Sequence, residues 1–248
     1  MTLLAVERIK LFTTRSPWWC ALITLGLTVG LAGMFAAAAP AGESLDVPTT
    51  QIGYQFGSAV IMVLAALSVT TEYRFGTIRT TFQAVPHRGS ALVAKTAVVA
   101  LLSLVIGEIA GFGSWGIAKL IRPKDNLALH TTADWINVAG VGVLFAFAAV
   151  IAVAVGILIR HSAGAIALLL IYSLAAENLI KLIPKAGEKI HKWMPFNVAD
   201  KFLSGGGNTA GRIVSDSPLS PGWALAYFAG FSIVLLAIAI GVAKKRDA

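Results

Sequence analysis

The chain has 248 residues, of which 57% are hydrophobic and 13% are charged, and its mean hydropathy is +0.79. A soluble domain of this length needs far more charge to cover its surface, so the composition excludes a water-soluble globular protein. The net charge of +8 lies at the ends of apolar runs and in loops, without a basic stripe interleaved with aromatic residues, so it does not indicate nucleic-acid binding.

Residues 1–17 are predicted to form an interfacial helix that precedes the first membrane span. An imperfect apolar stripe and four charged residues keep this segment at the membrane surface. Trp18 and Trp19 follow it directly and are typical of the aromatic belt at a membrane interface. The single cysteine, Cys20, lies in the first apolar run, which excludes an intrachain disulfide and a cysteine metal cluster.

Six apolar runs are long enough to cross a bilayer, which takes about 20 residues of helix. The predicted spans are residues 18–39, 52–70, 97–120, 136–159, 162–183 and 223–243. Because the runs are continuous rather than alternating, we expect one all-α polytopic transmembrane domain and not a barrel. Positive residues gather near the N-terminus, in residues 71–95 and at the C-terminus, so the positive-inside rule predicts that all three are cytoplasmic.

Residues 71–95 form the longest polar interruption in the first half of the chain. Four apolar residues within it recur at the spacing of one helical face: Phe75, Ile78, Phe82 and Val85. We expect a short amphipathic helix over about residues 75–86, ended by Pro86, that lies outside the membrane where another protein can push on it. Alternatively, this apolar face rests on lipid headgroups.

Residues 184–222 form the longest connection between spans and are expected on the extracellular side. The pattern predicts a short helix on or in the outer membrane surface, an interruption at Pro195, and a second turn capped by Asn197. Just before this connection, Glu177 and Lys181 are one helical turn apart, which predicts an ion pair between them.

Two glycine pairs at i, i+4 spacing predict close approach between helices. Gly26 and Gly30 lie in the first span, and Gly107 and Gly111 lie in the third. Packing within the chain is favoured for both pairs, although the motif also suits an interface between subunits.

The sequence offers little catalytic chemistry. It contains no Gly-Lys dipeptide and therefore no phosphate-binding loop of its own, and its four histidines lack metal-ligand spacing. No catalytic, cofactor-binding or metal site is predicted. Glu108 lies deep in the third span, where it either lines a substrate or ion path or hydrogen-bonds to another helix, and the structural role is favoured.

Three features together are similar to a known family. They are the basic interfacial N-terminal helix, the sequence Glu72-Tyr73-Arg74-Phe75-Gly76-Thr77-Ile78-Arg79 directly after the second span, and the stretch Trp193-Met194-Pro195-Phe196 between the fifth and sixth spans. In layout, length and topology the whole chain resembles the permease subunits of ABC-2 type transporters, also called type V ABC exporters.

The resemblance implies a dimer of identical or different permease subunits, each engaging one of two cytoplasmic ATPase subunits that hold ATP and Mg²⁺. It implies that residues 1–17 and the helix after the second span contact the ATPase, and that residues 184–202 form re-entrant helices. The implied ATPase-coupling residues are Glu72, Arg74, Phe75, Gly76, Thr77, Ile78, Arg79, Phe82 and Val85. The family exports drugs, peptides, lipids and polysaccharide; a hydrophobic or amphiphilic cargo crossing a bacterial plasma membrane is preferred, since only 9% of residues are aromatic.

Three other functions stay open at this point. An ion-coupled carrier or channel would use Glu108 and would transport without a partner. A non-transporting anchor or sensor would hold a partner on the same cytoplasmic face. A membrane-embedded enzyme is the least favoured, because no histidine lies within a predicted span.

Overall fold

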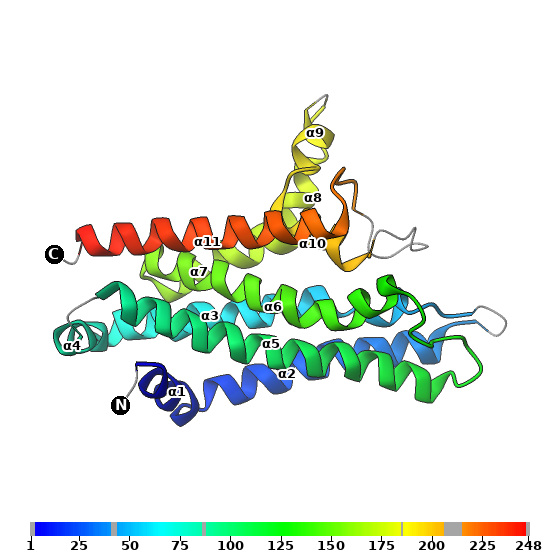
Figure 1. Cartoon of the computed structure of the whole chain (residues 1–248), viewed down its shortest axis with the longest axis horizontal. Helices are drawn as coiled ribbons and strands as arrows, with labels where there is room; N and C mark the ends of the chain where they lie inside the picture. Colours follow the sequence, from blue (N-terminus) through cyan, green and yellow to red (C-terminus); the bar gives the residue numbers. More distant parts are fainter. Residues whose placement is uncertain (1–2, 41–43, 86–87, 185, 206–214, 247–248) are drawn as a thin grey trace.

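The computed structural model describes residues 3–40, 44–85, 88–184, 186–205 and 215–246 (Figure 1). Within these residues every regular element is helical. Six helical segments are long and apolar enough to cross a membrane: Ser16–Ala38, Pro48–Phe75, Gly89–Ile121, Thr132–Ile159, Ser162–Ile180 and Pro221–Arg246. The predicted all-α fold with six spans is therefore confirmed in its coarse form.

Five long helices run along the long axis of the molecule (Figure 1). They are α2 (Ser16–Ala38), α3 (Tyr54–Phe75), α5 (Arg88–Ile121), α6 (Thr132–Ile159) and α11 (Pro221–Arg246). A 3₁₀ turn, Pro48–Gln51, leads into α3. Two short helices, α1 (Leu3–Thr13) and α4 (Thr77–Ala84), lie at the end of the bundle where both termini are found, which we call the termini end (Figure 1).

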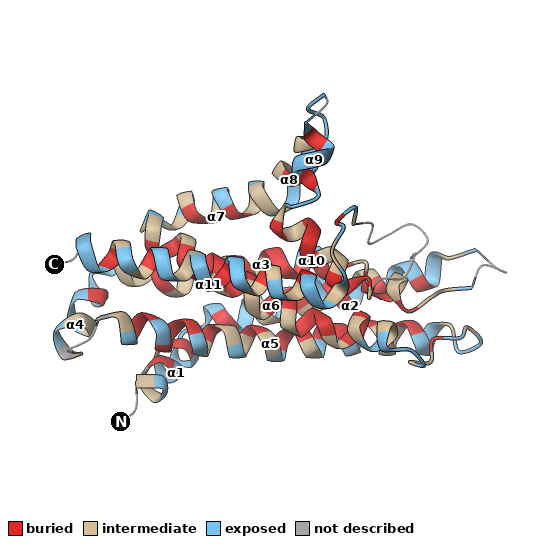
Figure 2. Cartoon of the chain, turned by 45° about the horizontal axis from the view of Figure 1, so that its top comes forward, coloured by how far each residue is buried: buried red, intermediate tan, exposed pale blue. Residues whose placement is uncertain are grey.

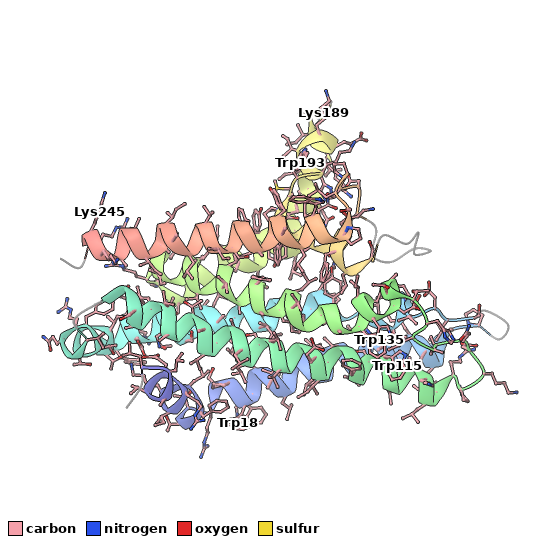
Figure 3. All side chains as sticks on the ribbon, viewed as in Figure 1. Trp18, Trp115, Trp135, Lys189, Trp193 and Lys245 are labelled. Carbon is pink, nitrogen blue, oxygen red and sulfur yellow. The ribbon has the colours of Figure 1, made fainter. Side chains whose placement is uncertain are left out.

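The fifth span is interrupted where the prediction had one continuous helix. It consists of α7 (Ser162–Ile171), a π-helical turn (Tyr172–Ala176) and α8 (Glu177–Ile180). α8 and α9 (Gly187–His191) project away from the bundle, and α10 (Pro195–Leu203) returns to pack beside α11 (Figure 1). Lys189 and Trp193 lie on this projection, far from Lys245 at the termini end (Figure 3).

The core lies on α6, which packs against α3, α5 and α11. In its most apolar stretch 72% of the residues are buried, whereas the corresponding share is 22% in α2 and 17% in α11. Figure 2 shows the same contrast between the interior of the bundle and the outer face of α11. α2 and α11 therefore turn most of their apolar surface outward, as expected of helices that face lipid.

One of the two glycine pairs packs as predicted. A Cβ atom on Gly107 would lie 2.6 Å from the Cα of Gly142, and one on Gly111 would lie 2.4 Å from the carbonyl oxygen of Val138, so both glycines permit the close contact of α5 with α6. The prediction for the other pair is wrong in this chain: nothing lies within 4 Å of a Cβ on Gly26 or Gly30, because this face of α2 points out of the bundle.

The helices at the termini end are longer than predicted. Residues 71–95 were expected to lie wholly outside the spans, but α3 continues to Phe75 and α5 begins at Arg88. The physical reason is that Glu72 and Lys95, which look like interruptions in the sequence, pair with each other across the two helices. Pro86, predicted to end the intervening helix, lies outside the described residues.

At the opposite end, the carboxylate of Glu177 caps α10. Its Oε1 accepts a hydrogen bond from the backbone N–H of Phe196 at 3.0 Å, and its Oε2 accepts one from Asn197 at 2.8 Å. This arrangement replaces both the predicted ion pair with Lys181 and the predicted cap by the Asn197 side chain, which instead donates to the carbonyl of His191 at 2.9 Å. Free N–H groups at a helix N-terminus favour an anion, and two of them satisfy this carboxylate.

Candidate partner-binding face and charge cluster

The turn between α3 and α4 depends on Gly76. Its φ of +73° lies in the left-handed region that glycine adopts without a steric penalty, and it both ends α3 and precedes α4. The predicted helix of residues 75–86 is therefore α4, Thr77–Ala84, and Phe75 belongs to α3 instead.

The apolar side of α4 faces the bundle. Ile78 is 5% exposed and Phe82 is half-buried against the core, so Ile78 is not available to a partner and Phe82 is available only in part. Val85 follows the helix in an extended conformation and is half-buried. Helical periodicity identifies an apolar face correctly here, but the ends of the spans already cover much of that face.

A different set of side chains is exposed at the same place. Arg74, Phe75, Gly76, Thr77 and Arg79 are exposed, and we call them the α4 face. Phe75 is 71% exposed, and the guanidinium carbon of Arg74 lies 5.5 Å from the centre of its ring. An exposed aromatic residue beside two arginines is the composition favoured at protein interfaces. Of the predicted coupling residues, these five are available to a partner.

Behind the α4 face lies a charge cluster of Glu7, Lys10, Glu72 and Lys95. Lys95 Nζ on α5 lies 2.5 Å from Glu7 Oε2 on α1 and 2.9 Å from Glu72 Oε1 on α3. Lys10 Nζ lies 2.9 Å from Glu7 Oε1, 3.4 Å from Glu72 Oε1 and 3.0 Å from the hydroxyl of Thr81 on α4. The cluster therefore joins α1, α3, α4 and α5.

The α1 members of the cluster are held in their charged forms. Burial raises the pKa of Glu7, but Lys95 and Lys10 outweigh this effect, so its pKa lies below the usual value. Burial likewise lowers the pKa of Lys10, but the neighbouring Glu7 and Glu72 carboxylates raise it above the usual value. Buried charges that are paired in this way are costly to separate, so α1 is fixed to the ends of α3 and α5.

A large cavity adjoins the cluster. Its volume is about 670 Å³, and residues of α1, α3, α4 and α5, with the first residues of α2, form its walls. Charged and hydroxyl groups occupy part of the lining, including all four members of the cluster, and apolar side chains of α3 and α5 occupy the rest.

Glu108, the predicted residue of a transport path, lies at the contact of α5 and α6. A Cβ on Gly142 would be 2.4 Å from Glu108 Oε1, so this carboxylate lies directly over the glycine. The side chain is half-buried and lines neither the large cavity nor the smaller one at the opposite end. Both roles considered for Glu108, in a transport path or in helix packing, stay predictions.

The smaller cavity contains an acidic residue that sequence reasoning missed. It has a volume of about 70 Å³, and Asp200 and Glu177 both line it. Burial raises the pKa of Asp200 to about 8, which keeps its carboxyl group neutral at pH 7. The one signal in the sequence was an acid among the apolar residues of an amphipathic turn, 197–203.

Nearby, His191 Nδ1 lies 2.7 Å from Asp216 Oδ1. Burial raises the pKa of Asp216, but the hydrogen bond with His191 outweighs this effect, and the pKa lies below its usual value. No group of three His, Cys, Asp or Glu residues in the described part of the chain could hold a metal ion.

No protein-family model matches the sequence, and no curated protein is similar enough to be counted as a relative. The fold defines the chain as a multi-pass helical membrane protein. Its more specific features are the exposed α4 face and the charge cluster behind it.

Proposed function

We propose that the chain is the membrane-spanning permease subunit of an ATP-driven exporter, and that a separate cytoplasmic ATPase drives it through the α4 face. The observation that carries this proposal is the charge cluster, which ties the exposed end of the molecule to two spans and to α1. A surface that only holds a partner needs no such connection to the spans.

The arrangement supports a route for mechanical force. A partner that presses on Phe75 acts on α3, and one that presses on Arg79 acts on α4, which the Gly76 turn joins to α3. α4 in turn contacts the core through Ile78, and Lys10 links its Thr81 hydroxyl to α1 and α3. Displacement of α4 would therefore move α1, α3 and α5 together, because the ion pairs between them are buried and resist separation.

The proposal places the termini end in the cytoplasm, as the positive charges of the sequence predict. It also includes a second permease subunit, and the outward face of α2 around Gly26 and Gly30 is open to such a neighbour or to lipid. ATP and Mg²⁺ would be held by the ATPase alone. A hydrophobic or amphiphilic cargo, such as a drug, lipid or peptide, is the class that we propose.

Charge reversal and apolar-to-acid substitution on the α4 face test the proposal. The chain would be purified from its native cells, and the purified material would be assayed for a copurifying ATPase and for transport. We expect Phe75→Asp and Arg79→Glu to lose the ATPase subunit and ATP-dependent transport. The matched control is Leu182→Asp, a residue that is 75% exposed at the opposite end.

Three results would contradict this proposal or favour one of the alternatives. If the α4-face variants keep normal ATP-driven transport, the coupling role is wrong. If the purified chain alone transports in liposomes under an ion gradient, and Glu108→Gln abolishes that transport, an ion-coupled carrier is the better description. A partner that binds the α4 face without any cargo movement would favour the anchor or sensor.

A further inference from the structure

The cavity of about 670 Å³ at the termini end is graded from polar to apolar. Hydroxyl groups of α4, those of Thr77, Thr80 and Thr81, line it at the outer side, and Leu64 and Val99 belong to its apolar lining on α3 and α5. Its volume lies in the range of about 300 to 1,000 Å³ that is usual for sites of small molecules.

The order of residues along α3 and α5 shows which end of the cavity is polar. On α3, Glu72 comes eight residues after Leu64, which is about 12 Å at 1.5 Å per residue. On α5, which runs the opposite way, Lys95 comes before Val99, so charge again lies nearer the termini end and apolar surface lies deeper in the bundle. An occupant that fits both parts has a polar head and an apolar tail.

Among the described residues, two hydrogen-bonding positions of the charge cluster have no partner. An ammonium group has three N–H donors, and for Lys95 the described residues supply acceptors for two, Glu7 Oε2 and Glu72 Oε1. Glu72 Oε2 is buried, and no described residue donates a hydrogen bond to it. The cluster as a whole is neutral, because Glu7 and Glu72 balance Lys10 and Lys95.

We infer that this cavity is a phospholipid site selective for a zwitterionic headgroup with a primary ammonium, as in phosphatidylethanolamine. A phosphate oxygen would accept the remaining hydrogen bond of Lys95. The ammonium would donate to Glu72 Oε2 after rotation of this carboxylate toward the cavity, because the atom is buried in the unliganded chain. The acyl chain would lie along the apolar lining of α3 and α5.

The N–H donors of the headgroup and its net charge together determine which phospholipid binds. Phosphatidylcholine has the same charges, but its quaternary ammonium has no N–H and cannot satisfy Glu72 Oε2. Phosphatidylglycerol has no cation, and a neutral cluster gives an anionic headgroup no net attraction. Phe75 and Thr77 of the α4 face also line this cavity, but the proposed lipid contacts are those of Glu72, Lys95 and the apolar lining, so the site would stand whether or not an ATPase drives the chain.

Lipid binding to the purified full-length chain tests the inference. The chain in detergent would be titrated with phosphatidylethanolamine, phosphatidylcholine and phosphatidylglycerol of identical acyl chains, and bound lipid would be counted by native mass spectrometry. We expect one phosphatidylethanolamine to bind about tenfold more tightly than either of the others, the factor that one charge-assisted hydrogen bond supplies. Equal affinity for the three lipids would overturn the inference.

Two variants locate the site. Glu72→Gln should abolish the preference for phosphatidylethanolamine, and Ser68→Phe, which places a ring in the cavity without touching the charges, should weaken this binding at least as much. Their controls are Glu188→Gln and Ser220→Phe, which are exposed and outside the cavity and should bind as the unsubstituted chain does. If Glu72→Gln fails to fold, Ser68→Phe decides: a preference that survives it contradicts the site.

Discussion

Buried acidic side chains are stabilised in different ways at the two ends of the bundle. At the termini end, two acidic and two basic side chains from α1, α3 and α5 form a network of ion pairs. At the other end, Glu177 accepts hydrogen bonds from two backbone N–H groups, and Asp200 is kept neutral by its raised pKa.

The ion pairs at the termini end connect helices that are distant in the sequence, whereas the contact made by Glu177 is local. Glu177, on α8, fixes the N-terminus of α10, which lies 20 residues later in the chain. The Glu7–Lys95 pair joins residues that are 88 positions apart and belong to different helices. Contacts between helices that are distant in the sequence are the kind that transmits a displacement through the bundle. We therefore expect substitutions at the two ends to have different effects.

The largest effect is expected for Lys95→Met. It leaves Glu7 and Glu72 buried with only the half-exposed Lys10 to balance them, so the free energy of unfolding should fall by about 3 to 5 kcal/mol. Denaturant unfolding in micelles, followed by circular dichroism, measures the change. Adding Glu7→Gln should restore part of the loss, and a Lys95→Met chain as stable as the unsubstituted one would contradict the structural role of the cluster.

A second effect, of pH rather than of a substitution, comes from Asp200. Its folded-state pKa of about 8 lies above its usual value of 3.8, so the folded protein binds more protons between these two values. Stability should therefore be greatest below about pH 4 as far as this group is concerned, and should fall by up to about 1.4 kcal/mol per pH unit until about pH 8. Asp200→Asn should flatten this part of the pH profile of the unfolding midpoint, and Asp216→Asn should not.

A smaller effect is expected for Glu177→Gln. The amide can no longer offer two charged acceptors to the N–H groups of Phe196 and Asn197, so the unfolding free energy should fall by about 2 kcal/mol. The matched control is Glu188→Gln on α9, which is exposed and should change stability little. Equal effects of the two substitutions would mean that Glu177 does not cap α10.

The smallest effects distinguish the two glycine pairs. Gly111→Ala should destabilise the chain by roughly 1 to 2 kcal/mol, because its Cβ would lie 2.4 Å from the carbonyl oxygen of Val138. Gly26→Ala meets no atom within 4 Å and should be neutral or slightly stabilising, since alanine favours helix more than glycine does. Unfolding of the two variants side by side checks this contrast.

The sequence predicts the parts of this structure that depend on local pattern. Apolar length predicts the six spans, and helical spacing predicts a helix near α4 and the close packing at Gly107 and Gly111. It does not predict what lies opposite a given face, which is why Ile78 and Phe82 were assigned to a partner and are instead covered, wholly or in part, by the bundle.

The sequence also does not predict which distant residues pair with each other. Nothing in the spacing of Glu7 and Lys95 indicates that they meet, because the tertiary arrangement of α1 and α5 brings them together. The same holds for Glu177, for which the local i, i+4 rule favoured Lys181 and the structure instead supplies the N-terminus of α10. In the candidate site, therefore, the exposed residues could be predicted and the buried network could not.

The sidedness of α4 tests the central claim most directly. In a Cys20→Ala chain, which has no other thiol, Arg79→Cys places a single cysteine on the exposed side of α4. A membrane-impermeant maleimide should label it in inside-out vesicles and leave it unlabelled in intact cells. Labelling in intact cells would place the α4 face outside the cytoplasm, beyond the reach of any ATPase, and would contradict the proposed function.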